Sequence, residues 1–558
     1  MESDKEITVV YGDVCLRKEK RKRQRSLLVE KFYDFTSSTT LHGLRYITQR
    51  GLHPVEKIFW LITFIISVLI CFYLMSNVWF KWKTCPVIVT LSERLVSVDE
   101  VPFPSVTICP QSKNSPKIYD YFEEKKNLYQ GLKYSMIHET NTIDQNQLEK
   151  LQDVSMICES EVLDLLWVDS YGFNTLDRLY SNISLVEHIL QVIPDFEEFF
   201  DSCVWRNEYI ECKKLFQRVL TSEGVCYTMN TLASSEIFRT ENLHGDFAYL
   251  ESTEMSRNWT IEEGYKSEDN NTYPRRGRKN GAEPDLKVVL KDNPEQKDKL
   301  CNKLKNGFKI FIHHPADLPQ PSLYYYSALS SQVSSMALKF DILRTSNSLD
   351  SLPVEQRQCY FPHERQLRYF QSYSSNNCRV ECLTNYTFTK CGCVAFYMPY
   401  HISDKICTLA KFECVKNAKE EVAQTRGMES ISDNAHACQC LPSCNSIDYD
   451  AEILKSEFHI KDYMTSFTKS FGYDDIYSET IMGNDSFSKI ELFYKLPRFM
   501  SFKRSELFGK TDFLANCGGL LGLFLGFSFL SLVEIIYFIT LRIWCALARE
   551  KRYQKNEK

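Results

Sequence analysis

Three polar side chains stand in an apolar stretch near the end of the chain, and their types and spacing suit an ion path. Ser528, Ser531 and Glu534 recur every three residues between Phe513 and Leu541, and Glu534 is the only charged residue of that stretch. Polar groups at membrane depth are costly unless they face protein or water. The pattern predicts a spanning helix that lines an aqueous pore and is interrupted or stretched around residues 526–528.

Glycines mark one face of the same stretch. Gly518, Gly522 and Gly526 recur at every fourth residue, so a helix would place them on one side, where backbones can approach closely. A plain helix-packing seam is the other interpretation of such spacing. The stretch of 29 residues exceeds the roughly 20 apolar residues that a bilayer requires.

A second apolar run, Ile58–Phe80, has 23 residues and no charge, and it starts too late and is too long for a cleaved signal peptide. Basic residues precede it at 17–23 and follow the other run at 549–552. A nuclear-localisation or nucleic-acid patch could have the same composition, but basic flanks beside a span indicate its cytoplasmic side. We therefore expect two spans, both termini in the cytoplasm, and no nucleic-acid partner. The expected regions are a tail at 1–57, a span at 58–80, an outside domain at 81–511, a pore span at 512–544 and a tail at 545–558.

The cysteines test this topology. Of the 21 in the chain, 17 lie between the two runs, which is typical of an oxidising compartment and a disulfide framework. The intervening region is also acidic, because residues 58–540 hold 49 basic and 62 acidic side chains. It carries every Asn-x-Ser/Thr acceptor that we expect to be glycosylated: Asn182, Asn258, Asn270, Asn385 and Asn484.

The outside region mixes patterns of both periods, as expected of an α+β domain. Strand-like segments are expected within 101–110, 308–312, 337–342 and 488–499. Residues 115–225 favour amphipathic helices, with 195–201 and 212–220 as examples. Residues 252–300 are polar and charged and predict a surface loop; Arg275 and Arg278 within it have the minimal spacing of a protease-processing site.

Residues 359–444 hold ten cysteines. Pairs of the form Cys-x-Cys can bind zinc, but His363, His401 and His436 show no paired ligand spacing, so we expect disulfides and no metal. Two helices stapled to a returning strand would form a stiff column that transmits displacement towards the membrane. No nucleophile and base stand together as in an enzyme, so we expect no catalytic activity.

The chain resembles the degenerin and epithelial sodium channel (DEG/ENaC) family, most closely its insect pickpocket-type branch. The similar motifs are spread over nearly the whole length. They are His42-Gly43, Phe103–Cys109, Gly224–Asn230, Glu355–Cys359, Cys438–Cys444 and Gly518–Ser528, followed by Leu530–Glu534.

The resemblance implies a homo- or heterotrimer with palm, β-ball, finger, knuckle and thumb regions, the thumb being the segment 359–444. It also implies a set of disulfides and leaves Cys85, Cys158 and Cys301 unassigned. The implied bridges are Cys109–Cys226, Cys203–Cys212, Cys359–Cys444, Cys378–Cys440, Cys382–Cys438, Cys391–Cys414 and Cys393–Cys407.

The resemblance further implies passive sodium conduction in the plasma membrane, with Na⁺ as the permeant ion and no cofactor. Gly526, Phe527 and Ser528 would form the selectivity filter through backbone carbonyls, and Gly522 would bind amiloride-type blockers. His42 and Gly43 would tune gating from a re-entrant segment, and Glu534 would concentrate cations unless it forms a structural ion pair. The remaining pore positions are Ala515, Asn516, Gly518 and Gly519.

Asn516 replaces an aspartate that is common in acid-sensing relatives, and no tryptophan precedes Cys359, which argues against gating by protons. The alternatives are an ATP-gated trimeric receptor channel of the same topology and a non-conducting regulatory or adhesion subunit. Membrane lipid and related subunits are the expected partners. The sequence does not indicate the stimulus.

Overall fold

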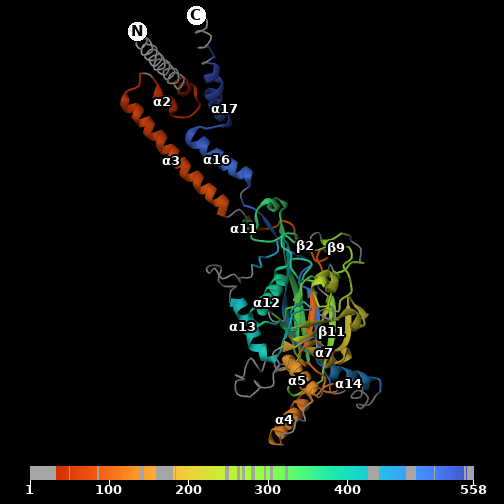
Figure 1. Cartoon of the computed structure of the whole chain (residues 1–558). Helices are drawn as coiled ribbons and strands as arrows, with labels where there is room; N and C mark the ends of the chain where they lie inside the picture. Colours follow the sequence, from red (N-terminus) through yellow and green to blue (C-terminus); the bar gives the residue numbers. More distant parts are fainter. Residues whose placement is uncertain are drawn as a thin grey trace, which may run out of the picture. The chain divides into compact units, whose positions relative to one another are not determined.

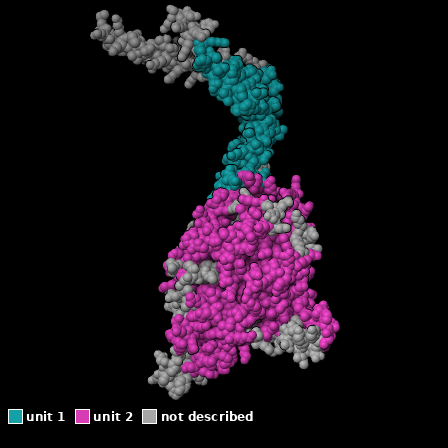
Figure 2. Space-filling model, turned by 90° about the vertical axis from the view of Figure 1, so that its right-hand side faces the viewer, with its two compact units in different colours: residues 1–88, 348–357, 505–558 teal, residues 89–347, 358–504 magenta. Residues whose placement is uncertain are grey.

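The computed structural model describes most of the chain in two compact units, which Figure 2 colours separately. Unit 1 comprises residues 1–88, 348–357 and 505–558, and unit 2 comprises residues 89–347 and 358–504. The described residues are 33–49, 51–84, 87–138, 144–158, 180–181, 184–244, 250–260, 264–266, 271–277, 283–293, 297–301, 306–320, 324–401, 403–424, 439–472, 485–507, 509–545 and 548–549.

Unit 1 is helical. Its longest element is α3 (Pro54–Thr84), which begins with proline at its first position, where no backbone N–H is needed. The second apolar run forms α16 (Lys510–Leu525) and α17 (Phe529–Tyr537), and a π-helical turn (Phe538–Arg542) continues α17. The short helix α2 (Leu44–Thr48) precedes α3. Figure 1 shows α16 and α17 as two separate helical segments.

Unit 2 is built on two sheets. Among the described residues the larger sheet has eight strands in the order β1-β19-β14-β17-β11-β5-β6, and β16 pairs with β14. Most pairs are antiparallel, but β14 runs parallel to β17 and β19. The bounds are β1 Val87–Leu91, β5 Phe200–Trp205, β6 Glu208–Ile210, β11 Leu286–Asp292, β14 Gln332–Thr345, β16 Ser446–Glu457, β17 Ser486–Tyr494 and β19 Ser501–Glu506.

The smaller sheet is antiparallel throughout, in the order β13-β12-β3-β8-β7. Buried residues of both sheets form one apolar core, in which Val106 and Ile310 of the small sheet join Val288 and Leu338 of the large one. The bounds are β3 Ser105–Pro110, β7 Gln217–Thr221, β8 Gly224–Met229, β12 Phe308–His313 and β13 Tyr326–Ala328.

A second core lies around the helices of unit 2. Cys109 and Cys226, on the small sheet, contribute to it together with buried residues of α5 and α7. The ten-cysteine segment supplies α12 and α13, and α14 follows β16. The bounds are α4 Tyr121–His138, α5 Gln145–Cys158, α7 Ser184–Gln191, α12 Ser375–Cys391, α13 Phe412–Gln424 and α14 Ile460–Ser470.

The expectation that residues 252–300 form a surface loop is wrong for residues 286–292. Residues 286–292 form β11, which pairs with β17 on one side and β5 on the other inside the large sheet. Leu286, Val288 and Leu290 are fully buried and alternate with the partly exposed residues Lys287, Val289 and Lys291, which is the period of a half-buried strand. The charged residues on either side of this strand concealed the alternation in the overall composition.

The expected helices at 195–201 and 212–220 are mostly wrong. Each begins with a single helical turn, α8 (Phe196–Phe199) or α9 (Cys212–Leu215), and then continues as a strand, β5 or β7. Phe196 and Phe200 have the i, i+4 spacing of a helix face, but their rings stack at 4.3 Å across the junction of α8 with β5. Pairing in the sheets therefore overrides the local helical pattern.

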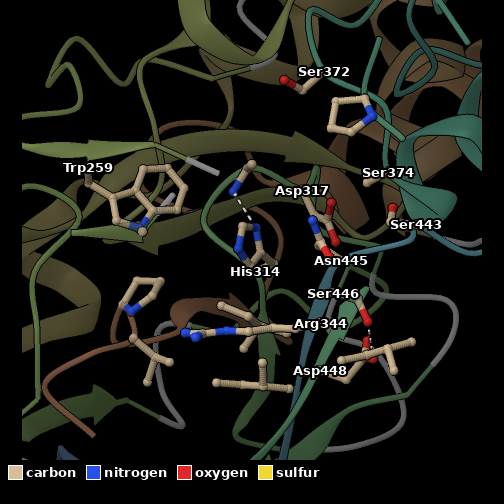
Figure 3. A pocket seen from close by; sticks show the side chains of 18 of the residues that line it. Trp259, His314, Asp317, Arg344, Ser372, Ser374, Ser443, Asn445, Ser446 and Asp448 are labelled. Carbon is tan, nitrogen blue, oxygen red and sulfur yellow. Dashed lines mark hydrogen bonds between the residues drawn. The ribbon is translucent and has the colours of Figure 1, made fainter. Parts of the chain in front are cut away.

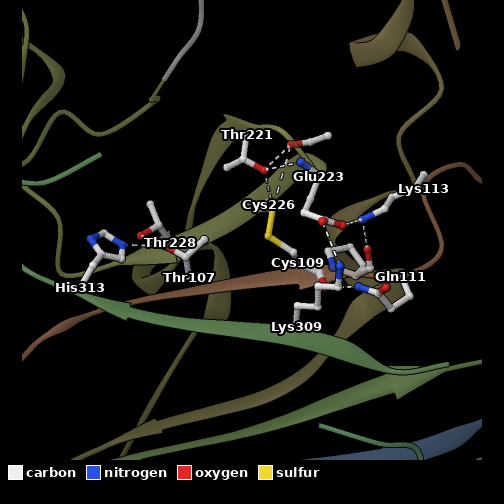
Figure 4. Close-up of a disulfide and its surroundings, with 12 residues drawn as sticks. Thr107, Cys109, Gln111, Lys113, Thr221, Glu223, Cys226, Thr228, Lys309 and His313 are labelled. Atoms are coloured by element: carbon white, nitrogen blue, oxygen red, sulfur yellow. Dashed lines mark hydrogen bonds and ion pairs between the residues drawn. A yellow bond between two sulfur atoms is a disulfide. The ribbon is translucent and has the colours of Figure 1, made fainter. Parts of the chain in front are cut away.

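Six of the seven bridges that the resemblance implied form in unit 2, while the seventh involves Cys438, which lies outside the described residues, as does Cys85. An additional bridge joins Cys158 to Cys301. Figure 4 shows the Cys109–Cys226 bridge beside a buried ionic cluster, in which Glu223 accepts from Lys309 at 2.9 Å.

Two of the glycosylation candidates are described, and both asparagines are exposed: Asn258, and Asn385 on α12. Asn182, Asn270 and Asn484 lie outside the described residues. The candidate processing site is only half described, because Arg278 is outside. Arg275 is held in the fold, since its backbone amide donates to Oδ1 of Asn230 at 2.6 Å.

Candidate pore segment

The two apolar runs pack together within unit 1. Phe513, in the first turn of α16, lies with its ring 5.7 Å from that of Trp79 and 5.3 Å from that of Trp82 on α3. At the start of α16 the amide of Gly509 donates to the Asp512 carboxylate at 3.0 Å, which fixes the entry into the helix.

The second run is interrupted at Gly526, Phe527 and Ser528. Gly526 adopts a left-handed conformation with φ of 65°, and its amide donates to the carbonyl of Gly522 at 3.0 Å. The amide of Phe527 donates to the carbonyl of Leu521 at 3.2 Å. These bonds terminate α16 and satisfy carbonyls that would otherwise lack partners.

Ser528 starts the next helix. Its hydroxyl accepts from the amide of Ser531 at 3.2 Å, while the amide of Ser528 donates to the Ser531 hydroxyl at 3.1 Å. These two reciprocal hydrogen bonds form a capping box at the N-terminus of α17. The helices on either side of the break are bent by 70°. The sequence expectation of an interruption at these three residues therefore agrees with the backbone.

The segment before α2 supports the break. The backbone amide of His42 donates to the carbonyl of Leu525 at 3.0 Å, at the last residue of α16. A methyl group added to Gly526 would lie 2.6 Å from the His42 ring. Gly43, with φ of 86°, turns the chain directly into α2. The break and the His42-Gly43 turn thus fit one another, and each contains a glycine that its conformation requires.

Glu534 is engaged by the same segment. The hydroxyl of Thr40 lies 2.8 Å from that of Ser531, and its amide and hydroxyl lie 3.4 and 3.3 Å from Oε2 of Glu534. Ser531 is 1% exposed, whereas the contacts of Thr40 with Glu534 are exposed. Among the described residues Glu534 forms no ion pair. The carboxylate is therefore positioned by a threonine and not by a basic side chain.

A third contact joins the first helical residues, 33–38, to the π-helical turn. Arg542 and Asp34 form an ion pair at 3.2 Å, and each side chain is 37% exposed. Beside it, the rings of Phe35 and Phe538 meet edge to face at 5.2 Å. The segment 34–43 therefore follows the second run from its end up to the break.

The glycine face of α16 is open in the single chain. A methyl group added to Gly518 or Gly519 would have no neighbour within 4 Å among the described residues, and at Gly522 the nearest atom is the Phe527 carbonyl oxygen at 3.9 Å. Ala515 and Asn516 are exposed. This face is thus not used for packing within the chain and is free to face water or another chain.

Sequence reasoning named the residues of the break, His42, Gly43 and Glu534, and the structure brings all of them together. It did not find Thr40 as the partner of Glu534, or the Asp34–Arg542 pair. Both contacts join residues about five hundred positions apart, so neither has a local signal. Ala515, Asn516, Gly518 and Gly519 lie earlier along α16, before the break.

One helix, α3, is long and apolar enough to cross a membrane by itself, and α16 with the segment after the break qualifies if the bent pair is one span. A family model described as amiloride-sensitive sodium channel matches residues 35–538. The chain belongs to that family. The matched region includes the break, α3 and the whole of unit 2.

Individual members of the family are similar over most of the chain. Pickpocket protein 28 of Drosophila melanogaster is 27% identical over 517 residues, which cover 92% of this chain and 78% of that protein. Sodium channel protein Nach of the same species is 23% identical over 524 residues, covering 91% and 86%. Acid-sensing ion channel 1C of Danio rerio is 23% identical over 512 residues, covering 90% and 82%. The resemblance to the DEG/ENaC family and its pickpocket members is thus confirmed.

Membership places the chain among cation-channel subunits of the plasma membrane and not among enzymes. The alternative of an ATP-gated receptor channel does not hold.

Proposed function

We propose that this chain is a subunit of a trimeric, sodium-selective and amiloride-sensitive channel, with α3 and the bent α16–α17 pair as its two spans and both termini in the cytoplasm. The observation that carries the proposal is the break at residues 526–528. No backbone amide of the described residues donates to the carbonyl of Gly526 or Phe527. Backbone without helical bonds is tolerated at membrane depth only where it faces protein or water.

Those carbonyls can replace part of the hydration shell of a permeating cation when three chains meet around one axis. The open glycine face of α16 suits such an assembly, since family members assemble as homo- or heterotrimers. Glu534, held by Thr40 near the break, supplies negative charge that attracts cations. Gly522 lies one turn before the break, where a blocker would obstruct the path.

The test is whole-cell recording with ion substitution and amiloride, for the chain alone and with related subunits. Ser528→Leu removes the helix cap and adds bulk at the filter, so we expect loss of sodium preference or of current. Ser76→Leu, an exposed serine on the unbroken α3, is the matched control and should leave reversal potentials unchanged.

Surface expression is measured in parallel. Unchanged reversal potentials for Ser528→Leu at normal surface expression would remove this segment from the selectivity role. Absence of current from the chain in every subunit combination, with normal surface expression, would favour the non-conducting regulatory alternative.

A further inference from the structure

Unit 2 contains a cavity of about 700 Å³ that the pore does not explain. The lining comes from six parts of the chain: the loop before β3, residues 259–276, the residues after β12, the end of β14, the start of α12 and the start of β16. Figure 3 shows side chains from these segments around one space. The volume falls within the range of roughly 300–1,000 Å³ that is typical of sites for small organic ligands.

Among the polar residues of the lining, two carboxylates and an imidazole interact with one another: Asp317, Asp448 and His314. Nδ1 of His314 accepts from the amide of Ala316 at 3.2 Å, so that nitrogen carries no proton. Burial lowers the pKa of His314, although Asp317 and Asp448 oppose the shift. The imidazole is therefore neutral at physiological pH, and it does not compensate the two carboxylates.

Asp317 is the deepest of these groups. It is 6% exposed, and Oδ2 accepts from the side-chain amide of Asn376 at 2.8 Å. Oδ1 has no hydrogen-bond partner among the described residues. A buried carboxylate oxygen without a donor is costly. A ligand that brings an N–H donor with positive charge would remove that cost.

Asp448 stands opposite on β16, and its carboxylate accepts from the Ser446 hydroxyl at 3.3 Å. Asp448 is itself exposed, but the desolvation that it does undergo raises its pKa, and the nearby Asp317 adds to the effect. Each carboxylate thus lies in the field of the other, and this local negative potential favours a cation.

Among the described residues, Asp317 and Asp448 form no ion pair with the three basic residues of the lining, Lys266, Arg276 and Arg344. The guanidinium of Arg276 lies 3.7 Å from the centre of the Tyr265 ring. Arg344 is exposed and forms no ion pair with either carboxylate among the described residues. Glu100 is partnered by Arg94 at 3.2 Å. Asp317 and Asp448 therefore dominate the potential around His314.

Aromatic side chains supply the apolar part of the lining. The Trp259 ring lies 6.1 Å from that of His314, and Tyr373 is 4% exposed at the start of α12. Aromatic faces attract organic cations by their quadrupoles and contact apolar rings equally well. A metal ion is less suitable, because the described residues contain no cluster of three ligating side chains.

We propose that this cavity binds a small organic cation, a protonated amine carried on an apolar ring, with the ammonium group between Asp317 and Asp448 and the ring against Trp259. Such a ligand would contact the ten-cysteine segment and the strands of the large sheet at once. The proposal concerns binding alone, so it stands or falls separately from conduction.

The test is equilibrium binding to the purified full-length chain, with benzylamine as the probe and benzyl alcohol as its neutral counterpart. We expect saturable binding of benzylamine and at least tenfold weaker binding of the alcohol. Asp317→Asn and Asp448→Asn should each weaken benzylamine by about tenfold or more, the effect of losing a hydrogen bond to a charged group. Asp462→Asn, which removes an 86% exposed carboxylate on α14, should have no effect.

Ser372→Trp tests the location without changing charge, because its bulk would fill the cavity and should abolish binding. Circular dichroism and thermal unfolding verify that each variant is folded. Equal affinity for amine and alcohol, equal affinity of wild type and the Asp317→Asn/Asp448→Asn double variant, or no saturable benzylamine binding would overturn the proposal.

Discussion

Both runs are apolar, yet the first forms one continuous helix and the second is broken. α3 runs for 31 residues without a glycine, and Cys71 is its one buried residue among those described. The second run has four glycines, ends its first helix at a left-handed residue and restarts at a serine cap. Large apolar side chains such as Leu69 and Phe72 are 62% and 68% exposed on α3, as suits contact with lipid.

The difference shows what a polar path requires from an apolar helix. A continuous helix satisfies its backbone internally and offers no oxygen to an ion. The broken run exposes backbone, and a separate segment, 34–43, has to hold it in place. We therefore expect changes at the break to have large effects on conduction and changes on α3 to have small ones.

The largest effect is expected from Gly526→Ala, which would make the second run more like the first. The left-handed conformation costs an alanine about 1–2 kcal/mol, and the added methyl would lie 2.6 Å from the His42 ring. We expect loss of current at the surface, measured as current per labelled channel. Gly131→Ala, at a helical glycine of α4 in unit 2, is the matched control, since its methyl meets no atom within 4 Å among the described residues. Similar currents from the two variants would contradict the required role of Gly526.

The second largest effect is expected at Ala515, in the outer part of α16. If three such helices meet there when the channel is closed, overpacking costs about 1–3 kcal/mol per site. Three sites together approach the roughly 5.5 kcal/mol that moves a two-state equilibrium from 1:99 to 99:1. Ala515→Val should therefore give a large standing cation current without stimulus.

Ser76→Val on α3 serves as the control for Ala515→Val. Resting currents are compared at matched surface density, with the likely partner subunits present. If resting currents are equal in a preparation where the wild type can be opened, Ala515 faces lipid and the closed helices do not meet there.

The break was predictable because its signal is local. Gly526 and Ser528 stand two residues apart, and each residue type has a backbone role that is independent of the rest of the fold. Most bridges followed from the resemblance, whereas Cys158–Cys301 did not, because 143 positions separate its members and the spacing offers no guide.

The wrong predictions of secondary structure arose where pairing between strands decides the structure. The strand β11 lies in a charged region, and its burial depends on β5 and β17, which are far away in the sequence. The helices expected at 195–201 and 212–220 instead continue as β5, which pairs with the distant β11, and β7, which pairs with the neighbouring β8. The contacts of Thr40 and Asp34 with the second run depend on how unit 1 folds, which no local pattern encodes.

A smaller effect is expected from Thr40→Val, which removes the hydroxyl that contacts Ser531 and Glu534. Two hydrogen bonds of about 0.5–1.5 kcal/mol each would be lost. The segment would then hold the break less firmly, and the preference for sodium over potassium should fall by up to about tenfold. Thr40→Ser keeps the hydroxyl and should conduct like the wild type. Equal selectivity of the valine and serine variants would show that Glu534 is positioned by other contacts.

The smallest effect is expected at the Asp34–Arg542 pair. Each side chain is 37% exposed, so the pair lies near solvent and contributes about 0–1 kcal/mol. The adjacent Phe35–Phe538 contact, worth about 0.5–1.5 kcal/mol, should hold the two segments together when the pair is lost. Asp34→Asn should change open probability less than about fivefold, and the exchange Asp34→Arg with Arg542→Asp should restore it.

High salt on the cytoplasmic side should mimic Asp34→Asn, because an exposed pair is screened. Phe35→Leu, which removes the ring contact but keeps the charges, should act additively with Asp34→Asn if the two contacts are independent. The measurement is single-channel open probability for both variants and their combination. An effect of Asp34→Asn as large as that of Gly526→Ala would mean that the end of the second run, and not its break, controls conduction.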